Sequence, residues 1–216
     1  TLEDSVIGNV EGDLASLWTN DGRGMDAIGV TVLGSTGCVL SGLTITNLKP
    51  GRGADGTVDN LGGRAIGVYL GSSDQGPTTG SLITDTVITG LLKGVSGTSS
   101  NKAMIMPTTQ QGFGVWIEES SLANQVNSSV VVDGDPVLYL YGADNKTLED
   151  VAVSSSASNT TNWGAVAVFD SQNVTVADVA IEHVTGHHGA DHDNQPWAGQ
   201  TVGVRMVECS GCSVDG

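Results

Sequence analysis

The sequence predicts an all-β fold in which short repeating coils stack on one another within a single domain, residues 1–216. A phrase of alternating small-polar and apolar residues recurs five times, and its copies begin 38, 43, 65 and 28 residues apart. A second phrase, a short strand that usually has glycine at its second position, precedes several copies of the first. No segment shows the i, i+3, i+4, i+7 spacing of an amphipathic helix. Self-similarity at a spacing of a few tens of residues is typical of a solenoid.

The first phrase occupies residues 2–7, 40–45, 83–88, 148–153 and 176–181. The second phrase occupies residues 28–32, 66–70, 113–117, 166–169 and 202–206. Apolar residues alternate within these phrases, as in Leu43-Thr44-Ile45, and this alternation places every second side chain on the inner side of a strand. The strands are therefore expected to be short, with glycine, asparagine or aspartate between them.

Two short strands followed by a loop of variable length make up one coil of a parallel β-helix. A single coil cannot bury its inner face, so coils stack on their neighbours. Glycine and asparagine are expected at the bends, where φ is positive. The variable loops, at residues 49–63, 94–111 and 186–199, fall at the same place in the repeat and should project from one side. The 65-residue gap should hold an additional coil, with strands at 129–132 and 137–141.

Residues 164–181, with the sequence GAVAVFDSQNVTVADVAI, carry a resemblance to a known family. This pattern resembles the coil repeat of right-handed parallel β-helix proteins, the pectate-lyase-like superfamily. The resemblance extends over nearly the whole chain and implies a right-handed solenoid of about five to six coils. Neither terminus resembles a cap, so we expect the chain to be part of a longer array. The repeat residues are structural, so the resemblance implies architecture and not activity.

Composition and charge restrict the classes of partner. Aromatic residues make up 4% of the chain and glycine contributes 31 residues, which is typical of a β-rich and turn-rich protein. The net charge is −16 with only eight basic residues, and this argues against a nucleic-acid partner because phosphate binding requires clustered lysine and arginine. No run approaches the roughly 18 apolar residues of a membrane helix, so no membrane span is expected.

Four sequons for N-glycosylation, at Asn127, Asn145, Asn159 and Asn173, favour an extracellular or cell-surface glycoprotein. Cys209 and Cys212 form a C-x-x-C pair, and no second pair is present to complete a zinc site. A local disulfide between them and two free, packed thiols remain open alternatives.

The four histidines of the chain all lie between residues 183 and 192. Within this segment Asp191, His192 and Asp193 are candidate ligands for a transition metal, although their spacing matches no established site and a solvated polar loop explains them as well. The Asp133-Gly134-Asp135 run is an ordinary turn or, alternatively, a source of oxygen ligands for Ca²⁺. We therefore expect no cofactor, with Ca²⁺ as the alternative.

A hydrolase is the main alternative to a structural protein. Gly186-His187-His188-Gly189 and Val204-Arg205-Met206 are faintly similar to motifs of polygalacturonase-like glycosidases, and this resemblance would make Asp170, His187 and Arg205 participants in catalysis. The chain has no Asp-Asp pair, however, and glycoside hydrolysis requires two carboxylates across the scissile bond. A polysaccharide lyase would need a cluster of aspartates that the sequence does not show.

The sequence favours a non-enzymatic extracellular protein, structural or adhesive, that forms a rod or filament segment. We expect self-association or contact with other extracellular proteins, and glycans as further partners. A glycan-binding module that uses the four tryptophans is a third reading, because tryptophan can stack on sugar rings.

Overall fold

The computed structural model describes residues 1–13, 24–53, 62–95, 109–110, 112–154, 158–182 and 202–215. The described residues form 23 short strands and one 3₁₀ helix, η1 (Glu119–Ser121), so the all-β prediction is confirmed. Most of the strands pair in parallel. Within the described part of the chain no helix is long and apolar enough to cross a membrane.

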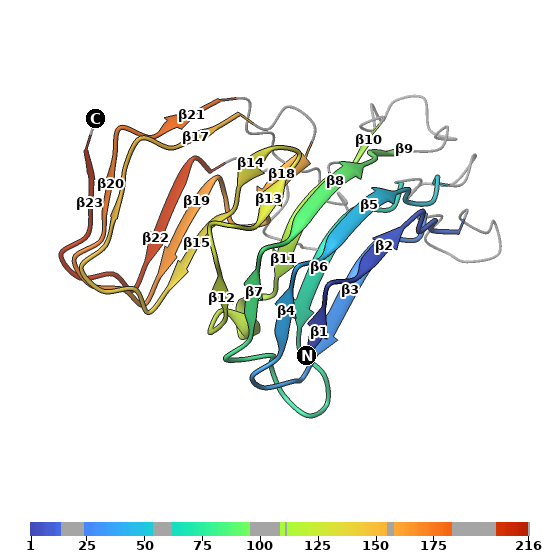
Figure 1. The fold of residues 1–216 in the computed structure, drawn as a ribbon, viewed down its shortest axis with the longest axis horizontal. Coiled ribbons are helices and arrows are strands. Elements are labelled where there is room, and N and C mark those ends of the chain that lie inside the picture. The colour runs from blue at the N-terminus through green and yellow to red at the C-terminus, as the bar shows by residue number, and fades with distance from the viewer. Residues whose placement is uncertain are drawn as a thin grey trace, which may run out of the picture.

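Strands from successive passes of the chain line up in three parallel sheets, which we call the first stack (Figure 1). The first of these sheets contains β1 (Leu2–Glu3), β4 (Val39–Ser41), β7 (Leu82–Thr84) and β12 (Gln125–Val126). The second sheet contains β2 (Val6–Gly8), β5 (Thr44–Leu48), β8 (Val87–Leu91) and β13 (Val131–Val132). The third contains β3 (Ala27–Leu33), β6 (Ala65–Gly71), β11 (Gly112–Ile117) and β18 (Ser158–Thr161).

The later strands form a second set of parallel sheets, the second stack, which continues along the long axis of the molecule in Figure 1. One sheet contains β15 (Leu138–Tyr141), β19 (Val166–Phe169) and β22 (Val204–Val207). The next contains β16 (Thr147–Leu148), β20 (Thr175–Ala177) and β23 (Ser213–Asp215), and the last contains β17 (Ala152–Val153) and β21 (Ala180–Ile181). Strands β13 and β15 lie where the additional coil was expected.

An antiparallel hairpin separates the two stacks. Strand β13 pairs with β14 (Asp135–Pro136) through a two-residue turn in which Asp133 and Gly134 have φ of 50° and 99°. An Asp-Gly turn with two positive φ values has the twist that a tight hairpin requires. The expected loop at 94–111 is bounded by a second antiparallel pair, β9 (Gly94–Val95) with β10 (Thr109–Gln110).

Strand β18 joins the two stacks. It follows β17 of the second stack in sequence but pairs with β11 of the first. The chain then turns back into β19. At this turn the indole Nε1 of Trp163 donates to the carbonyl of Ile117 at 2.9 Å, and nearby the Tyr139 hydroxyl donates to the carbonyl of Leu122 at 2.6 Å.

The core consists of apolar columns that run from coil to coil. In the first stack Ile7, Ile45, Ile88 and Val132 occupy equivalent positions, and the last three are fully buried. In the second stack Leu138, Val166 and Val204 form a corresponding column. Each column stacks branched side chains of neighbouring coils, as the period-two alternation predicts.

Bends with left-handed backbone also repeat from coil to coil. Among the described residues, eleven other than glycine have positive φ, and all are Asn, Asp or Glu: Asp4, Asn9, Asn47, Asp85, Asp133, Asn145, Asp150, Asp170, Asn173, Asp178 and Glu208. Asn and Asp tolerate this conformation because their short side chains bond locally. The bends expected for Gly and Asn are therefore present, and Asp takes more of them than Asn does.

The glycines of the second phrase mark a close approach between sheets. Gly29, Gly67 and Gly114 share one column of the β3–β6–β11 sheet. A Cβ at Gly67 would lie 2.8 Å from the Cδ1 of Ile88, and one at Gly114 would lie 2.1 Å from a methyl carbon of Val132. Such distances are shorter than a van der Waals contact, so only glycine fits.

One bend of the first stack is polar but buried. Thr78, Ser81, Ser121 and Asn124 are almost completely inaccessible to solvent. Asn124 Nδ2 donates to the carbonyls of Thr78 and Ser121, and its Oδ1 accepts from the amide of Ser81 at 2.8 Å. These side chains satisfy backbone groups that a bend leaves unpaired inside the protein.

Candidate functional site: the outward face of β3, β6 and β11

The sheet β3–β6–β11 carries a mixed aromatic and charged face. Its register places Thr31, Tyr69 and Trp116 side by side on neighbouring strands. Thr31 is exposed and the two aromatic side chains are half-buried. Charged residues lie at the two ends of these strands: Asp26 and Arg64 immediately precede β3 and β6, and Glu118 immediately follows β11.

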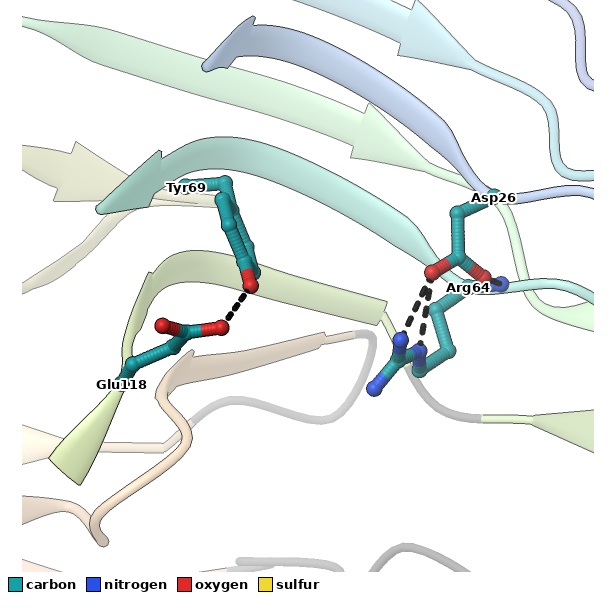
Figure 2. A network of polar contacts seen from close by, with 4 residues as sticks. All are labelled: Asp26, Arg64, Tyr69 and Glu118. Carbon is teal, nitrogen blue, oxygen red and sulfur yellow. Dashed lines mark hydrogen bonds and ion pairs between the residues drawn. The ribbon is translucent and has the colours of Figure 1, made fainter. Parts of the chain in front are cut away.

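At one end Asp26 and Arg64 form an ion pair between neighbouring coils (Figure 2). The Asp26 carboxylate accepts from the Arg64 amide at 2.7 Å, and its Oδ2 accepts from the guanidinium Nη2 at 2.7 Å and Nε at 3.2 Å. The guanidinium carbon also lies 4.5 Å from the centre of the Trp116 ring. A planar guanidinium can donate to a carboxylate through its edge while its face lies over an aromatic ring.

At the other end the hydroxyl of Tyr69 donates to Glu118, as the left side of Figure 2 shows. The other oxygen of Glu118 accepts from the amide and hydroxyl of Ser72, at 2.7 and 2.8 Å. Burial and the neighbouring carboxylate raise the pKa of Tyr69 to about 12. Burial works against ionisation of Glu118, but the bonds from Tyr69 and Ser72 outweigh it and hold the pKa of Glu118 below its ordinary value of 4.5.

These contacts limit the chemistry of the face. A glycosidase needs a carboxylic acid whose pKa is raised, so that it can protonate the leaving group. Glu118 has the opposite shift, and Asp26 is held by an arginine. The arrangement is therefore suited to holding side chains in fixed positions on a surface, and poorly suited to acid catalysis by these two groups.

A groove of about 500 Å³ lies at the junction of the two stacks. Its lining residues come from η1 and the residue after it, from the turn before β19, from β19, and from β22 and the segment just before it: Glu119, Leu122, Trp163, Phe169, Val202, Val204, Arg205, Met206 and Val207. The guanidinium carbon of Arg205 lies 5.2 Å from the centre of the Trp163 ring. Thus Trp116 and Trp163 each have an arginine over one ring face.

The structure places two of the three hydrolase candidates. Arg205 lies in β22 beside Ala167 of β19, over Trp163. Asp170 follows β19 at a left-handed bend with φ of 45°. Burial and the nearby negative charge of Asp170 raise the pKa of Tyr141. His187 lies outside the described residues, as do the candidate metal ligands Asp191, His192 and Asp193.

The described residues contain no group of three or more His, Cys, Asp or Glu side chains placed to hold a metal ion. At the sequence proposed as the Ca²⁺ alternative, Asp133 Oδ1 accepts from the amide of Gly90 at 3.1 Å. Asp135 Oδ1 accepts from the amide and hydroxyl of Ser154. Both carboxylates therefore serve as hydrogen-bond acceptors between segments of the fold.

Three of the sequon asparagines, Asn127, Asn145 and Asn173, are exposed, and Asn159 lies in β18. Cys209 and Cys212 are free thiols that pack against the core of the second stack. The Cys212 sulfur accepts from the amide of Val174 at 3.4 Å. Glycosylation and a disulfide therefore stay predictions.

Comparison with protein-family models, curated proteins and solved structures finds no match to this chain. The candidate site accordingly rests on its own geometry. Sequence reasoning missed Asp26, Arg64, Tyr69 and Glu118. Asp26 and Arg64 could have been found from the sequence. They have opposite charges and are 38 residues apart, which is the spacing between the first two coils, so they occupy equivalent positions on neighbouring strands.

Proposed function

We propose that the chain is a non-enzymatic extracellular protein, structural or adhesive, built as a right-handed parallel β-helix of about five to six coils. The observation that carries this proposal is the use of polar side chains to connect one coil to the next. Asp26 pairs with Arg64, Glu118 binds Ser72 and Tyr69, and Asn173 donates to Asn145. Side chains committed in this way support a rigid rod.

The right-handed sense rests on a general rule. Where a strand is connected by a crossover to a parallel strand of the same sheet, about 98% of connections are right-handed because of strand twist. The pairing of β3 with β6 and of β15 with β19 is of this kind. The pectate-lyase-like architecture remains a resemblance of sequence pattern.

The strongly acidic composition supports a surface function in the extracellular space. A net charge of −16 keeps a protein soluble. We propose that the partners are other extracellular proteins or further copies of the chain, with glycans as additional partners. The face of β3, β6 and β11 offers an ordered set of donors, acceptors and rings for such contacts.

Electron microscopy and fibre diffraction of the native material test the rod. Rods with a reflection at about 4.8 Å along their axis are expected, because neighbouring coils are spaced like strands in a sheet. A D26A variant should give less regular rods, and an E11A variant, whose ion pair with Lys49 is well exposed, serves as its control. Compact particles without an axial repeat would contradict the proposal.

A carbohydrate-active enzyme is the second candidate, and the groove with Arg205 is the observation that favours it. Assays for reducing sugars and for unsaturated uronides across a polysaccharide panel separate it from the structural reading. Turnover that is lost in R205A and kept in K49A would replace the structural proposal with the enzymatic one, with Asp170, His187 and Arg205 as participants.

A glycan-binding module receives less support from the described tryptophans. Sugar rings bind to an open aromatic face, whereas Arg64 lies over Trp116 and Arg205 over Trp163. A sugar would have to displace a guanidinium from the covered face, at the cost of a cation–π contact.

A further inference from the structure

The sheet of β15, β19 and β22 packs against both stacks. The face with Leu138 and Val166 belongs to the core of the second stack. The opposite face, with Tyr139, Ala167 and Phe169, belongs to the core cluster of the first stack. On β15 and β19 this second face is closed, since Tyr139 is 1% exposed and Phe169 is 3% exposed. An apolar interface between the two stacks therefore runs across these two strands.

The next strand, β22, continues this interface but is less covered. The register places Arg205 beside Ala167 and Val207 beside Phe169, on the same face of the sheet. Val207 is nevertheless 40% exposed. The groove of about 500 Å³ lies here, and it is lined by both of these β22 residues and by Trp163. The groove is thus the open end of the interface between the stacks, and its volume is within the range of small-molecule sites.

The lining of the groove is mostly apolar. Glu119 and Arg205 are the charged side chains among its described lining residues, and the other seven are apolar. The polar atom of Trp163 is used within the fold, because its Nε1 donates to the carbonyl of Ile117. A sugar carries hydroxyl groups around its whole ring, and each loses its hydrogen bonds to water unless the site replaces them. These side chains therefore suit a hydrocarbon better than a sugar.

The two aromatic rings in the lining are engaged with their neighbours. Trp163 and Phe169 meet edge to face, with their ring centres 5.4 Å apart. The guanidinium of Arg205 lies over one face of Trp163. The rest of the apolar lining consists of Leu, Val and Met side chains, and Met in particular adapts to irregular shapes. A flexible aliphatic chain fits such a lining better than a flat ring does.

Arg205 supplies the charge that the head group of a ligand would meet. A guanidinium has five N–H donors in one plane, so it can hold a carboxylate along its edge while its face stays over Trp163. An arginine and a carboxylate can form two parallel, charge-assisted hydrogen bonds. Glu119 is exposed on η1, where water and salt screen its charge. The charge complementary to the groove is therefore negative.

We propose that this groove binds a free fatty acid, a monocarboxylate with an aliphatic chain. The carboxylate accepts hydrogen bonds from Arg205, and the chain lies against Trp163, Phe169 and Val207. The chain thereby continues, at the open end, the apolar packing that the two stacks share across β15 and β19. Binding is non-covalent and does not depend on the rod that we propose for the whole chain.

Calorimetric titration of the full chain with three probes tests the class of ligand. Decanoate should bind, and 1-decanol should bind about tenfold more weakly because it has the same chain without the charge. Galacturonate should not bind measurably, because it has a carboxylate but no chain for the apolar lining. Absence of decanoate binding, equal affinity for decanoate and decanol, or tighter binding of galacturonate would each overturn the inference. None of these results would affect the rod proposal, which the fibre measurements test separately.

Substitution of Arg205 tests where the carboxylate binds. R205Q should weaken decanoate binding by about tenfold and leave decanol binding unchanged, because only the charged head group loses its partner. R205K should fall between R205Q and the unmodified protein, since it keeps the charge without the fork of donors. K49Q, at a lysine in a well-exposed ion pair, is the control and should bind decanoate normally. Equal decanoate affinity in R205Q and K49Q would contradict the inference.

Filling the groove tests where the chain of the ligand lies. V207W places a large side chain in the groove at a position that is 40% exposed, and it should abolish binding of both decanoate and decanol. V87W makes the same change at a valine of β8 that is 43% exposed, and it should bind both probes normally. Thermal melts without ligand show whether each variant is folded, and the Arg205 variants decide the question if V207W is not. Unchanged binding in folded V207W would overturn the inference.

Discussion

The two stacks share the same short strand pattern, but they have different residues at one inward-facing position of that pattern. In the first stack Gly29, Gly67 and Gly114 form a column in which no Cβ fits. In the second stack the corresponding column, one position before the paired Leu138, Val166 and Val204, contains Val137, Ala165 and Gly203. A Cβ at Gly203 would lie 3.6 Å from Ile181 Cδ1, an ordinary contact.

This difference shows what requires glycine in the phrase. The first stack brings one sheet close to Ile45, Ile88 and Val132, and glycine is needed because there is no space for a side chain. The second stack leaves enough space for alanine and valine. Glycine is therefore required at this position only where two sheets lie too close together for a side chain. The coil itself does not require it.

Substitution in the glycine columns should have the largest effect. G114A places a methyl group 2.1 Å from Val132 Cγ2 and should reduce the free energy of unfolding by about 3 kcal/mol. G203A should change it by less than about 1 kcal/mol, because its methyl group finds an ordinary contact. Urea unfolding followed by circular dichroism measures both. Equal losses would show that the two stacks are equally tight at this column.

The ion pair on the outward face of the first stack should give the next largest effect. D26N leaves the guanidinium of Arg64 without its carboxylate and should cost about 1–2 kcal/mol, since the pair is only partly exposed. E11Q breaks the ion pair with Lys49, in which both side chains are more than half exposed, and should cost less than about 0.5 kcal/mol. Thermal melts in 50 mM and 1 M NaCl measure the loss of stability in each variant. The difference between the two losses should be smaller in 1 M NaCl. Equal losses for both variants would mean that burial does not strengthen the Asp26–Arg64 pair.

The hydrogen bond between Tyr69 and Glu118, which connects neighbouring coils, should make a smaller, pH-dependent contribution to stability. The pKa of Tyr69 is raised, so its contribution to stability is present below pH 10 and is lost as the pH rises towards 12. The pKa of Glu118 is lowered, so its contribution is present at neutral pH and is lost as the pH falls below 4.5. In Y69F the thermal midpoint should fall less steeply at alkaline pH than in the unmodified protein. In E118Q it should fall less steeply at acid pH. Unchanged slopes in both variants would mean that this pair does not couple protonation to folding.

Much of the fold is readable from the sequence because the strands are defined locally. The alternation in Leu43-Thr44-Ile45 predicts a half-buried strand, and β5 is found there. The division into two stacks is not readable in this way. Asp133-Gly134 indicates a turn, but no local pattern states that the strands after it will pair with a new set of neighbours.

The candidate site was harder to predict because its contacts connect different coils. Tyr69 and Glu118 meet only because β11 lies beside β6 in one particular register, and that register depends on the length of the connection between the strands. The role of Asn173 is hidden for the same reason. Its triplet reads as a glycosylation sequon, whereas its donor contact with Asn145 depends on the stacking of two bends.

The return of the chain to the first stack in β18 has a consequence for how such a molecule can be divided. A cut at the Asp133-Gly134 hairpin would leave β11 without the strand that extends its sheet, and that strand would remain on the other fragment. Neither half is thus a complete building block. Gene rearrangements that shuffle whole modules would have to move residues on both sides of the hairpin together.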